Sequence, residues 1–387
     1  MHKSIFIASR LRFKGKIAIA CIAVSFFVMI IASSISSGFR HELSSSISDL
    51  SGDVLISSPG MNILSGIDPV DSADSCISYV EESECVAYAM PAVWRAGIVK
   101  HGDTVHGVAV KGIPSKDNDS IALGVSIPRK LSQASGLKPG DKMLTYFIDD
   151  GLKVRQFNVT DIHDALIEAD DRHIVYASLS DMQRLNGWTP SQASAIEVHL
   201  KDGLDSEEEI MEASRHIGAI VSLYQESGDL VASSSVSRYP QLFNWLALID
   251  FNVGFILLLM TIAAGFNMIS GLLIMLFEHI STIGVLKSMG MTDADVSKVF
   301  LASSARFAGI GMLIGNAASL LFCQIQDATH FLKLNPENYY ISYVPVKIDL
   351  GQILMTDAVS FSVIMLLLLV PCLFISKVDP AQTVRVR

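Results

Sequence analysis

Four long runs of apolar residues constrain the fold of this chain more than any other feature. They cover residues 17–35, 245–277, 300–322 and 358–375. A helix needs roughly 20 apolar residues to cross a hydrocarbon core about 30 Å thick, and each run is near that length. The 387 residues are 50% hydrophobic with a mean hydropathy of +0.43, which leaves room for a substantial polar part. The sequence therefore predicts a membrane protein with four transmembrane helices.

The polar part is one block between the first and second runs, and it is long enough for one or two domains. Residues 38–245 hold 30 acidic and 16 basic side chains, a net charge of −14, whereas the rest of the chain has a net charge of +4. Because an acidic surface repels phosphate backbones, nucleic acid is not expected as a partner.

The basic residues at the beginning of the chain predict its orientation. The first 16 residues contain five lysines and arginines and no carboxylate. By the positive-inside tendency, this end is expected in the cytoplasm. Four spans then place both termini and residues 278–299 inside, and the acidic block outside. A cleaved signal peptide is the alternative, but the first run is longer than a usual signal-peptide core, which favours an uncleaved span.

The expected organisation follows the order of the chain. It comprises a basic cytoplasmic N-terminus (1–16), a first span (17–37), an extracytoplasmic α/β domain (38–244), a second span with a stalk (245–277), a cytoplasmic loop (278–299), a third span (300–323), an extracytoplasmic loop (324–352), a fourth span (353–376) and a cytoplasmic C-terminus (377–387). The second run would be about 50 Å long as a helix, which favours a protruding stalk over a tilted ordinary span.

The polar block shows the patterns of a mixed α/β domain. Short segments rich in Val, Ile, Phe and Tyr indicate strands at 52–58, 95–113, 142–149, 156–162, 173–178 and 195–200. Helices are expected at 74–84, 128–135, 179–186 and 206–217. Cys76 and Cys85 share this block and could pair in an oxidising compartment, and their spacing leaves that question open.

The loop between the second and third runs has helical spacing of its own. In "ISTIGVLKSMG", residues 280–290, the apolar residues recur at Ile280, Ile283 and Leu286, and Gly290 is a plausible helix end. Thr292, with Asp295 three positions on, predicts the start of a second helix that enters the third run. The residues alone leave two interpretations open: a lever gripped by a cytoplasmic partner, or a helix lying in the head groups.

Small residues in the third run indicate helix packing. Gly309, Gly311 and Gly315 lie close together, and Gly311 and Gly315 have the small-xxx-small spacing that allows two helices to approach in lipid.

Several segments resemble one family of transporters. "IGVLKSMGMTDADVSKVF", residues 283–300, is similar to the coupling-helix signature of the MacB/FtsX/Lol group of ABC transporter permeases. "GFRHEL" at 38–43, "VAVKGIP" at 108–114, "GLKPGDKMLTY" at 136–146, residues 259–279 and "VDPAQTVR" at 378–385 resemble further stretches of lipoprotein-releasing permeases in the same order. The resemblance covers almost the whole chain.

This resemblance implies a permease of the lipoprotein-releasing (LolC/LolE) type with a MacB-like periplasmic domain in the bacterial inner membrane. Two permease copies, or this chain and a sister permease, would flank a cytoplasmic ABC ATPase dimer. That dimer would bind ATP and Mg, so no cofactor is expected in this chain. The ATPase would contact Ile283, Gly284, Leu286, Lys287, Met289 and Gly290. A lipoprotein would be passed to a periplasmic carrier, for which Asp149, Asp150, Lys153 and Arg155 are the candidate contact.

Other function classes lack their motifs in this sequence. It contains no G-x-x-x-x-G-K-[ST] phosphate loop, no H-E-x-x-H spacing and no G-x-S-x-G elbow. We therefore expect a non-catalytic subunit with no metal site, driven by another chain. The alternatives left open are an FtsX-like module that signals to a cell-wall hydrolase, and a MacB-like efflux permease.

Overall fold

The computed structural model describes residues 16–62, 68–102, 104–114, 123–148, 152–163, 173–226, 230–335 and 341–372. The chain divides into two compact units. The helical unit comprises residues 1–39, 245–334 and 342–387, and the α/β domain comprises residues 40–244 and 335–341. Each is described by itself.

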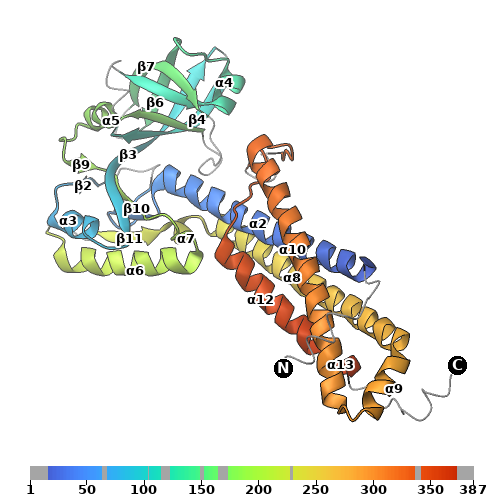
Figure 1. Ribbon diagram of the computed structural model, residues 1–387. Helices are drawn as coiled ribbons and strands as arrows, with labels where there is room; N and C mark the ends of the chain where they lie inside the picture. Colours follow the sequence, from blue (N-terminus) through green and yellow to red (C-terminus); the bar gives the residue numbers. More distant parts are fainter. Residues whose placement is uncertain are drawn as a thin grey trace. The chain divides into compact units, whose positions relative to one another are not determined.

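Within the described residues, four helices are long and apolar enough to cross a membrane. They are α2 (Lys16–Ser51), α8 (Pro240–Glu278), α10 (Asp293–Thr329) and the stretch Leu350–Cys372, which consists of α12 (Leu350–Leu367) and α13 (Leu369–Cys372) (Figure 1). The break between α12 and α13 comes just before Pro371, whose ring and missing N–H disfavour a continuous helix. The four predicted apolar helices are confirmed.

The first helix is longer than its apolar run. It continues through 38–51, where the sequence predicts the start of the α/β domain. Leu43, Ile47 and Leu50 are buried and recur at helical spacing, so this polar, serine-rich extension is amphipathic. The second long helix, α8, is also continuous and begins at Pro240, a residue favoured in the first turn of a helix.

The α/β domain is built on a sheet that closes on itself. The strands are β1 (Val54–Ser57), β3 (Val86–His101), β4 (Thr104–Ile113), β5 (Gly124–Pro128), β6 (Lys142–Ile148), β7 (Leu152–His163), β8 (His173–Ser178), β10 (Ala195–Leu200) and β11 (Val231–Ser234). Their order is β11-β1-β10-β3-β4-β8-β5-β7-β6, and β6 also pairs with β3. Strands β3, β4, β8, β5, β7 and β6 therefore form a barrel.

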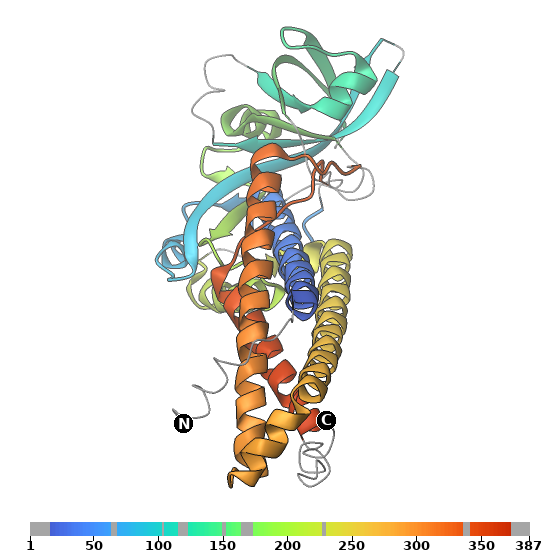
Figure 2. The ribbon, with the colours of Figure 1, turned by 45° about the vertical axis from the view of Figure 1, so that its right-hand side comes forward.

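Strand β3 belongs to two sheets. Residues Val86 to Ala92 pair with β10, whereas Val93 to His101 pair with β4 in the barrel. Figure 2 shows β3 as one long curved ribbon. The predicted strand begins only at 95, because Pro91 interrupts the pattern. The proline lies next to the point at which β3 changes neighbours, where such a residue is tolerated.

Helices and short strands complete the domain. They are α3 (Ser75–Glu81), α4 (Arg129–Ser135), α5 (Leu179–Asn186), α6 (Glu207–Tyr224) and α7 (Ser235–Arg238), with β2 (Val70–Asp71) pairing with β9 (Gln192–Ala193). Helix α6 begins with a capping box: Ser206 Oγ accepts from the amide of Glu209, and the Glu209 carboxylate accepts from the amide of Ser206. The expected mixed α/β domain between the first and second spans is confirmed.

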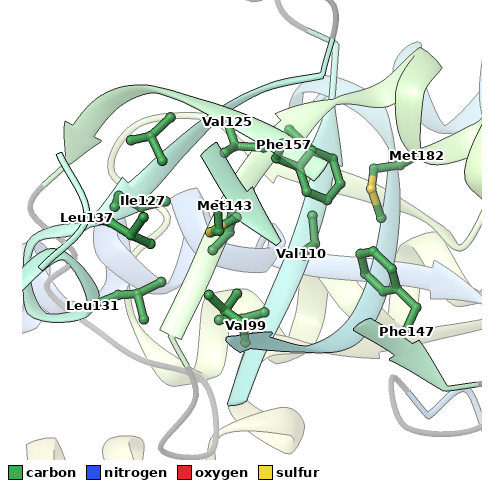
Figure 3. Close-up of a cluster of buried hydrophobic side chains, with 14 of the residues drawn as sticks. Val99, Val110, Val125, Ile127, Leu131, Leu137, Met143, Phe147, Phe157 and Met182 are labelled. Atoms are coloured by element: carbon green, nitrogen blue, oxygen red, sulfur yellow. The ribbon is translucent and has the colours of Figure 1, made fainter. Parts of the chain in front are cut away.

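Each unit has its own core. In the barrel, Phe147, Phe157 and Met143 are buried with aliphatic residues from β3, β4 and β5 (Figure 3). In the helical unit, Phe26, Met268 and Phe300 come from α2, α8 and α10.

Candidate functional sites

The segment between α8 and α10 forms the predicted helical loop. Helix α9 (Ile280–Ser288) follows α8 almost directly, and Gly290 has a φ of +90°, a conformation that suits glycine. Thr292 caps α10: its Oγ1 accepts from the amide of Asp295 and donates to that residue's carboxylate at 2.8 Å. The two-helix interpretation of this loop is confirmed.

The predicted coupling residues lie on different faces of this loop. Ile283 and Gly284 are buried, and Ile283 belongs to the core of the helical unit. Leu286 is half-buried. Met289 is 77% exposed, and Gly290 is exposed as well. Of the predicted residues in α9 and its turn, Met289 therefore offers the most apolar surface to a partner.

Two further residues define this loop. Val285, which was not predicted, is 50% exposed and lies one helical turn before Met289, so the two form a small exposed apolar face. Lys287 lies 2.8 Å from Asp293, and its side chain is only 9% exposed. This ion pair joins α9 to the beginning of α10.

The glycines of α10 differ in their surroundings. A Cβ on Gly311 would lie 2.8 Å from Cβ of Ile22, and one on Gly315 would lie 2.5 Å from the carbonyl oxygen of Ala23. Both contacts are with α2. At Gly309, a Cβ would meet nothing within 4 Å. The close packing of α2 on α10 thus depends on Gly311 and Gly315.

The candidate carrier contact lies at the β6–β7 hairpin. Lys153 and Arg155 are on β7 opposite Phe147 and Thr145 of β6, and Arg155 is exposed. Asp149 and Asp150 lie outside the described residues.

Cys76 is a buried free thiol, Cys85 is also free, and burial raises the pKa of Cys76 to about 12.

A cluster of buried charges at the end of α2 was not predicted. Lys111 of β4 and Glu197 of β10 form an ion pair with 2.8 Å between Nζ and Oε2, and both side chains are almost fully buried. Trp94 of β3 donates from Nε1 to the other carboxylate oxygen of Glu197 at 3.2 Å. Burial lowers the pKa of Lys111 and raises that of Glu197, and each charge opposes the shift of its partner.

The same lysine reaches the helix. Its Nζ donates to the carbonyl oxygens of Asp49 at 3.2 Å and Leu50 at 2.7 Å. Arg238, the last residue of α7, donates to the carbonyl oxygens of Ser51 at 3.0 Å and Gly52 at 2.6 Å. No local pattern in the sequence indicates this cluster, because Lys111 and Arg238 are far apart in the chain and only the folded domain brings both to the end of α2.

A histidine lies beside this cluster. His199 of β10 is 5% exposed, its Nδ1 lies 3.1 Å from Ser48 Oγ, and its ring stacks on Tyr88 at 4.4 Å. Burial, and then the charge of Lys111, lowers the pKa of His199 to about 4. Nearby Asp53 accepts from the amide of Leu200, and burial raises the pKa of its carboxyl.

Four apolar helices with an α/β domain between the first and second define the chain as a multi-pass membrane protein. Residues 254–380, which contain most of α8 and all of α9 and α10, match the family model described as FtsX-like permease C-terminal. The last third of the chain therefore contains an FtsX-like permease C-terminal region, and the chain is a distant homologue of LolC proteins over most of its length.

The relatives cover nearly the whole chain at low identity. The lipoprotein-releasing system transmembrane protein LolC of Neisseria meningitidis serogroup B is 21% identical, over 95% of this chain and 93% of that protein. LolC of Xylella fastidiosa strain Temecula1 is 20% identical, over 94% of this chain and 92% of that protein.

Two solved structures were also found. The periplasmic region of MacB from Actinobacillus actinomycetemcomitans is 14% identical with a TM-score of 0.33, and covers 51% of this chain and 96% of that chain. The extracellular domain of the noncanonic ABC-type transporter YknZ from Gram-positive bacteria is 10% identical with a TM-score of 0.31, and covers 47% of this chain and 98% of that chain.

Proposed function

We propose that this chain is the permease subunit of an ABC transporter that extracts lipoproteins from the bacterial inner membrane and releases them to a periplasmic carrier. The observation that carries the proposal is the distant similarity to LolC proteins along about 95% of the chain, which includes both the helices and the α/β domain. A separate ATPase in the cytoplasm supplies the energy by binding ATP and Mg.

The exposed apolar face of the α9 loop is evidence that a partner protein binds on the side of the membrane where this loop lies. Val285 and Met289 present an apolar face on a short helix between α8 and α10. An exposed apolar face is costly in water unless it is covered. The positive charge of residues 1–16 supports a cytoplasmic position for this loop, with the α/β domain on the periplasmic side.

Binding at this loop would drive the transporter mechanically. Closure of the ATPase on ATP would displace α9, and α8 and α10 would move with it because both adjoin it in the chain. The α/β domain would follow and lift a lipoprotein from the outer leaflet toward its carrier.

The first experiment tests the cargo. The chain is purified with the ATPase that accompanies it, and ATP hydrolysis is measured in nanodiscs with and without an acylated lipoprotein. We expect stimulation by the acylated form and none by the same protein without its acyl chains. Hydrolysis that responds instead to a peptidoglycan hydrolase would support the FtsX-like signalling role, and stimulation by small amphiphiles alone would support efflux.

The second experiment tests the ATPase contact. Met289→Glu places a charge in the exposed apolar face and should abolish co-purification of the ATPase while the chain still inserts. Leu286→Glu should do the same, but this side chain is half-buried, so Met289→Glu separates binding from folding more cleanly. Val105→Glu, at an apolar residue 60% exposed on β4, is the matched control. Normal co-purification with Met289→Glu would contradict the assignment.

A further inference from the structure

The end of α2 is held by two cations, those of Lys111 and Arg238. The last four carbonyl groups of a helix have no partner within the helix. In α2 these belong to Ser48, Asp49, Leu50 and Ser51, and each has a donor here: the amide of Gly52 for Ser48, Lys111 for Asp49 and Leu50, and Arg238 for Ser51. No carbonyl of this turn is left unsatisfied.

The charges also suit the helix. The carboxyl end of a helix carries a partial negative charge, which a nearby cation stabilises. Lys111 and Arg238 provide two cations at this one end, and the first is fully buried. The three protons of the Lys111 ammonium match three oxygens, those of Asp49, Leu50 and Glu197.

Stability alone does not explain a buried ion pair. Replacing such a pair with apolar side chains of similar volume is often neutral or stabilising. The ammonium of Lys111, however, does what an apolar side chain cannot: it bonds the end of α2 to β4, while Glu197 holds it from β10. The pair therefore joins α2 to both sheets that share β3.

Arg238 connects the two places where the chain enters and leaves the domain. It precedes α8 by two residues, yet it donates to the carbonyl groups of Ser51, the last residue of α2, and of Gly52. It also donates to the carbonyl of Ser233 at 3.1 Å. Strand pairing reinforces the junction, since Val54 of β1 lies opposite Ser234 of β11.

We propose that Lys111 and Arg238 are positioning residues that bind the end of α2 and the beginning of α8 to the α/β domain, so that displacement of either helix moves the domain with it. The proposal rests on the mechanical function proposed above. It assigns the transmission step to a defined set of contacts, which we call the α2 clamp: Lys111, Glu197, Arg238 and the carbonyl groups of Asp49, Leu50 and Ser51.

The informative variant removes both charges of the pair. Lys111→Met alone leaves Glu197 buried without its cation, and this variant is expected to fold poorly. Lys111→Met/Glu197→Gln leaves no unpaired buried charge, so the domain should fold. The double variant still removes the donor to the carbonyl groups of Asp49 and Leu50. It therefore tests the attachment of α2 to the domain in a domain that remains folded.

The readout is a distance within one chain. Nitroxide labels are placed at Ser45 on α2 and Arg184 on α5, both exposed, in the full chain with its ATPase and with the native cysteines replaced. In the parent we expect one narrow distance that is the same with and without ATP. In the double variant we expect a broad distribution, and lipoprotein-stimulated hydrolysis lower by about fivefold or more, with basal hydrolysis retained. Arg238→Lys should act in the same direction, and Lys100→Met, at an exposed lysine of β3, is the control.

The outcomes separate the clamp from the transporter. A narrow distance and full stimulation in the double variant would overturn the clamp, as would a parent distance that changes with ATP. If no ATPase binds the parent, the proposed function fails, but the width of the distance distribution without nucleotide still tests the clamp.

Discussion

Gly38 and Pro345 are in such close contact that no side chain fits between them: a Cβ on Gly38 would lie 2.5 Å from the carbonyl oxygen of Pro345. Gly38 lies within α2, and Pro345 belongs to the segment that precedes α12. A second contact joins the same parts, because the amide of Lys347 donates to the carbonyl of Ser34 at 3.1 Å. Both residues belong to the helical unit.

The first prediction concerns this contact. In an unobstructed helix, replacing glycine with alanine gains about 0.5–1 kcal/mol. Gly38→Ala should instead lower the thermal denaturation midpoint of the purified chain, because backbone obstructs the Cβ. Gly254→Ala in α8 is the control, since nothing lies within 4 Å of its Cβ position, and it should not lower the midpoint. Equal shifts in the two variants would contradict the close contact.

A second prediction compares two glycines of α10. Gly315→Leu forces side-chain atoms onto the backbone of α2 and should cost about 1–3 kcal/mol or more. Gly309→Leu points into open space and should leave the unfolding midpoint within about 0.5 kcal/mol of the parent. Chemical denaturation of the full chain in detergent measures both. A larger loss for Gly309→Leu would mean that α10 presents a different face to α2.

The third prediction is a pH dependence at His199. Its folded-state pKa of about 4 lies below the ordinary 6.5, so the unfolded chain binds a proton before the folded chain does. Stability from this group is complete above pH 6.5 and is lost as the pH falls toward 4, with about 2 kcal/mol lost at pH 5. Asp53 has the opposite effect on stability. Because its pKa is raised in the folded chain, its protonation at low pH favours the folded state.

Comparison of variants isolates the histidine. The loss of stability between pH 7 and pH 5 should be smaller in His199→Gln than in the parent by about 2 kcal/mol. His216→Gln, at an exposed position of α6, should keep the parent's profile. Identical profiles for parent and His199→Gln would show that the histidine is not buried in its neutral form.

The fourth prediction concerns the two cysteines of the α/β domain. Both thiols are free, and Cys76 is buried with a pKa raised to about 12. Because the thiolate is the reactive form, Cys76 should react with a maleimide far more slowly than Cys85 in the native chain. Single Cys→Ser variants assign each rate by mass spectrometry. If neither reacts until a reductant is added, the two are paired in a disulfide.

The parts of the fold that sequence predicts best are those with a local signal. The loop from α9 to α10 is an example: Gly290 and Thr292 mark its turn, and the capping interaction with Asp295 is local. The bounds of α5, Leu179–Asn186, agree with the predicted helix at 179–186 because the signals that mark this helix are also local. The extension of α2 was missed, although Leu43, Ile47 and Leu50 carried its spacing, because the serines between them resemble a loop.

What sequence could not provide is pairing over long distances. Lys111 and Glu197 are 86 positions apart, and only the strand order β10-β3-β4 brings them together. Likewise, the resemblance to the coupling-helix signature assigned both Ile283 and Met289 to the partner surface, whereas the tertiary packing buries the first and exposes the second. Burial of a short helix depends on which neighbour covers it, and the spacing does not carry that information.

The pairing of β1 with β11 has a consequence for how such chains can change. Because Val54 lies opposite Ser234, the α/β domain is an insertion whose two ends are neighbours. A domain attached through adjacent ends can be exchanged for another one with the same spacing, while the membrane helices keep their sequence. A different domain can therefore replace this one without change to the membrane helices, provided the replacement supplies its own donors for the end of α2.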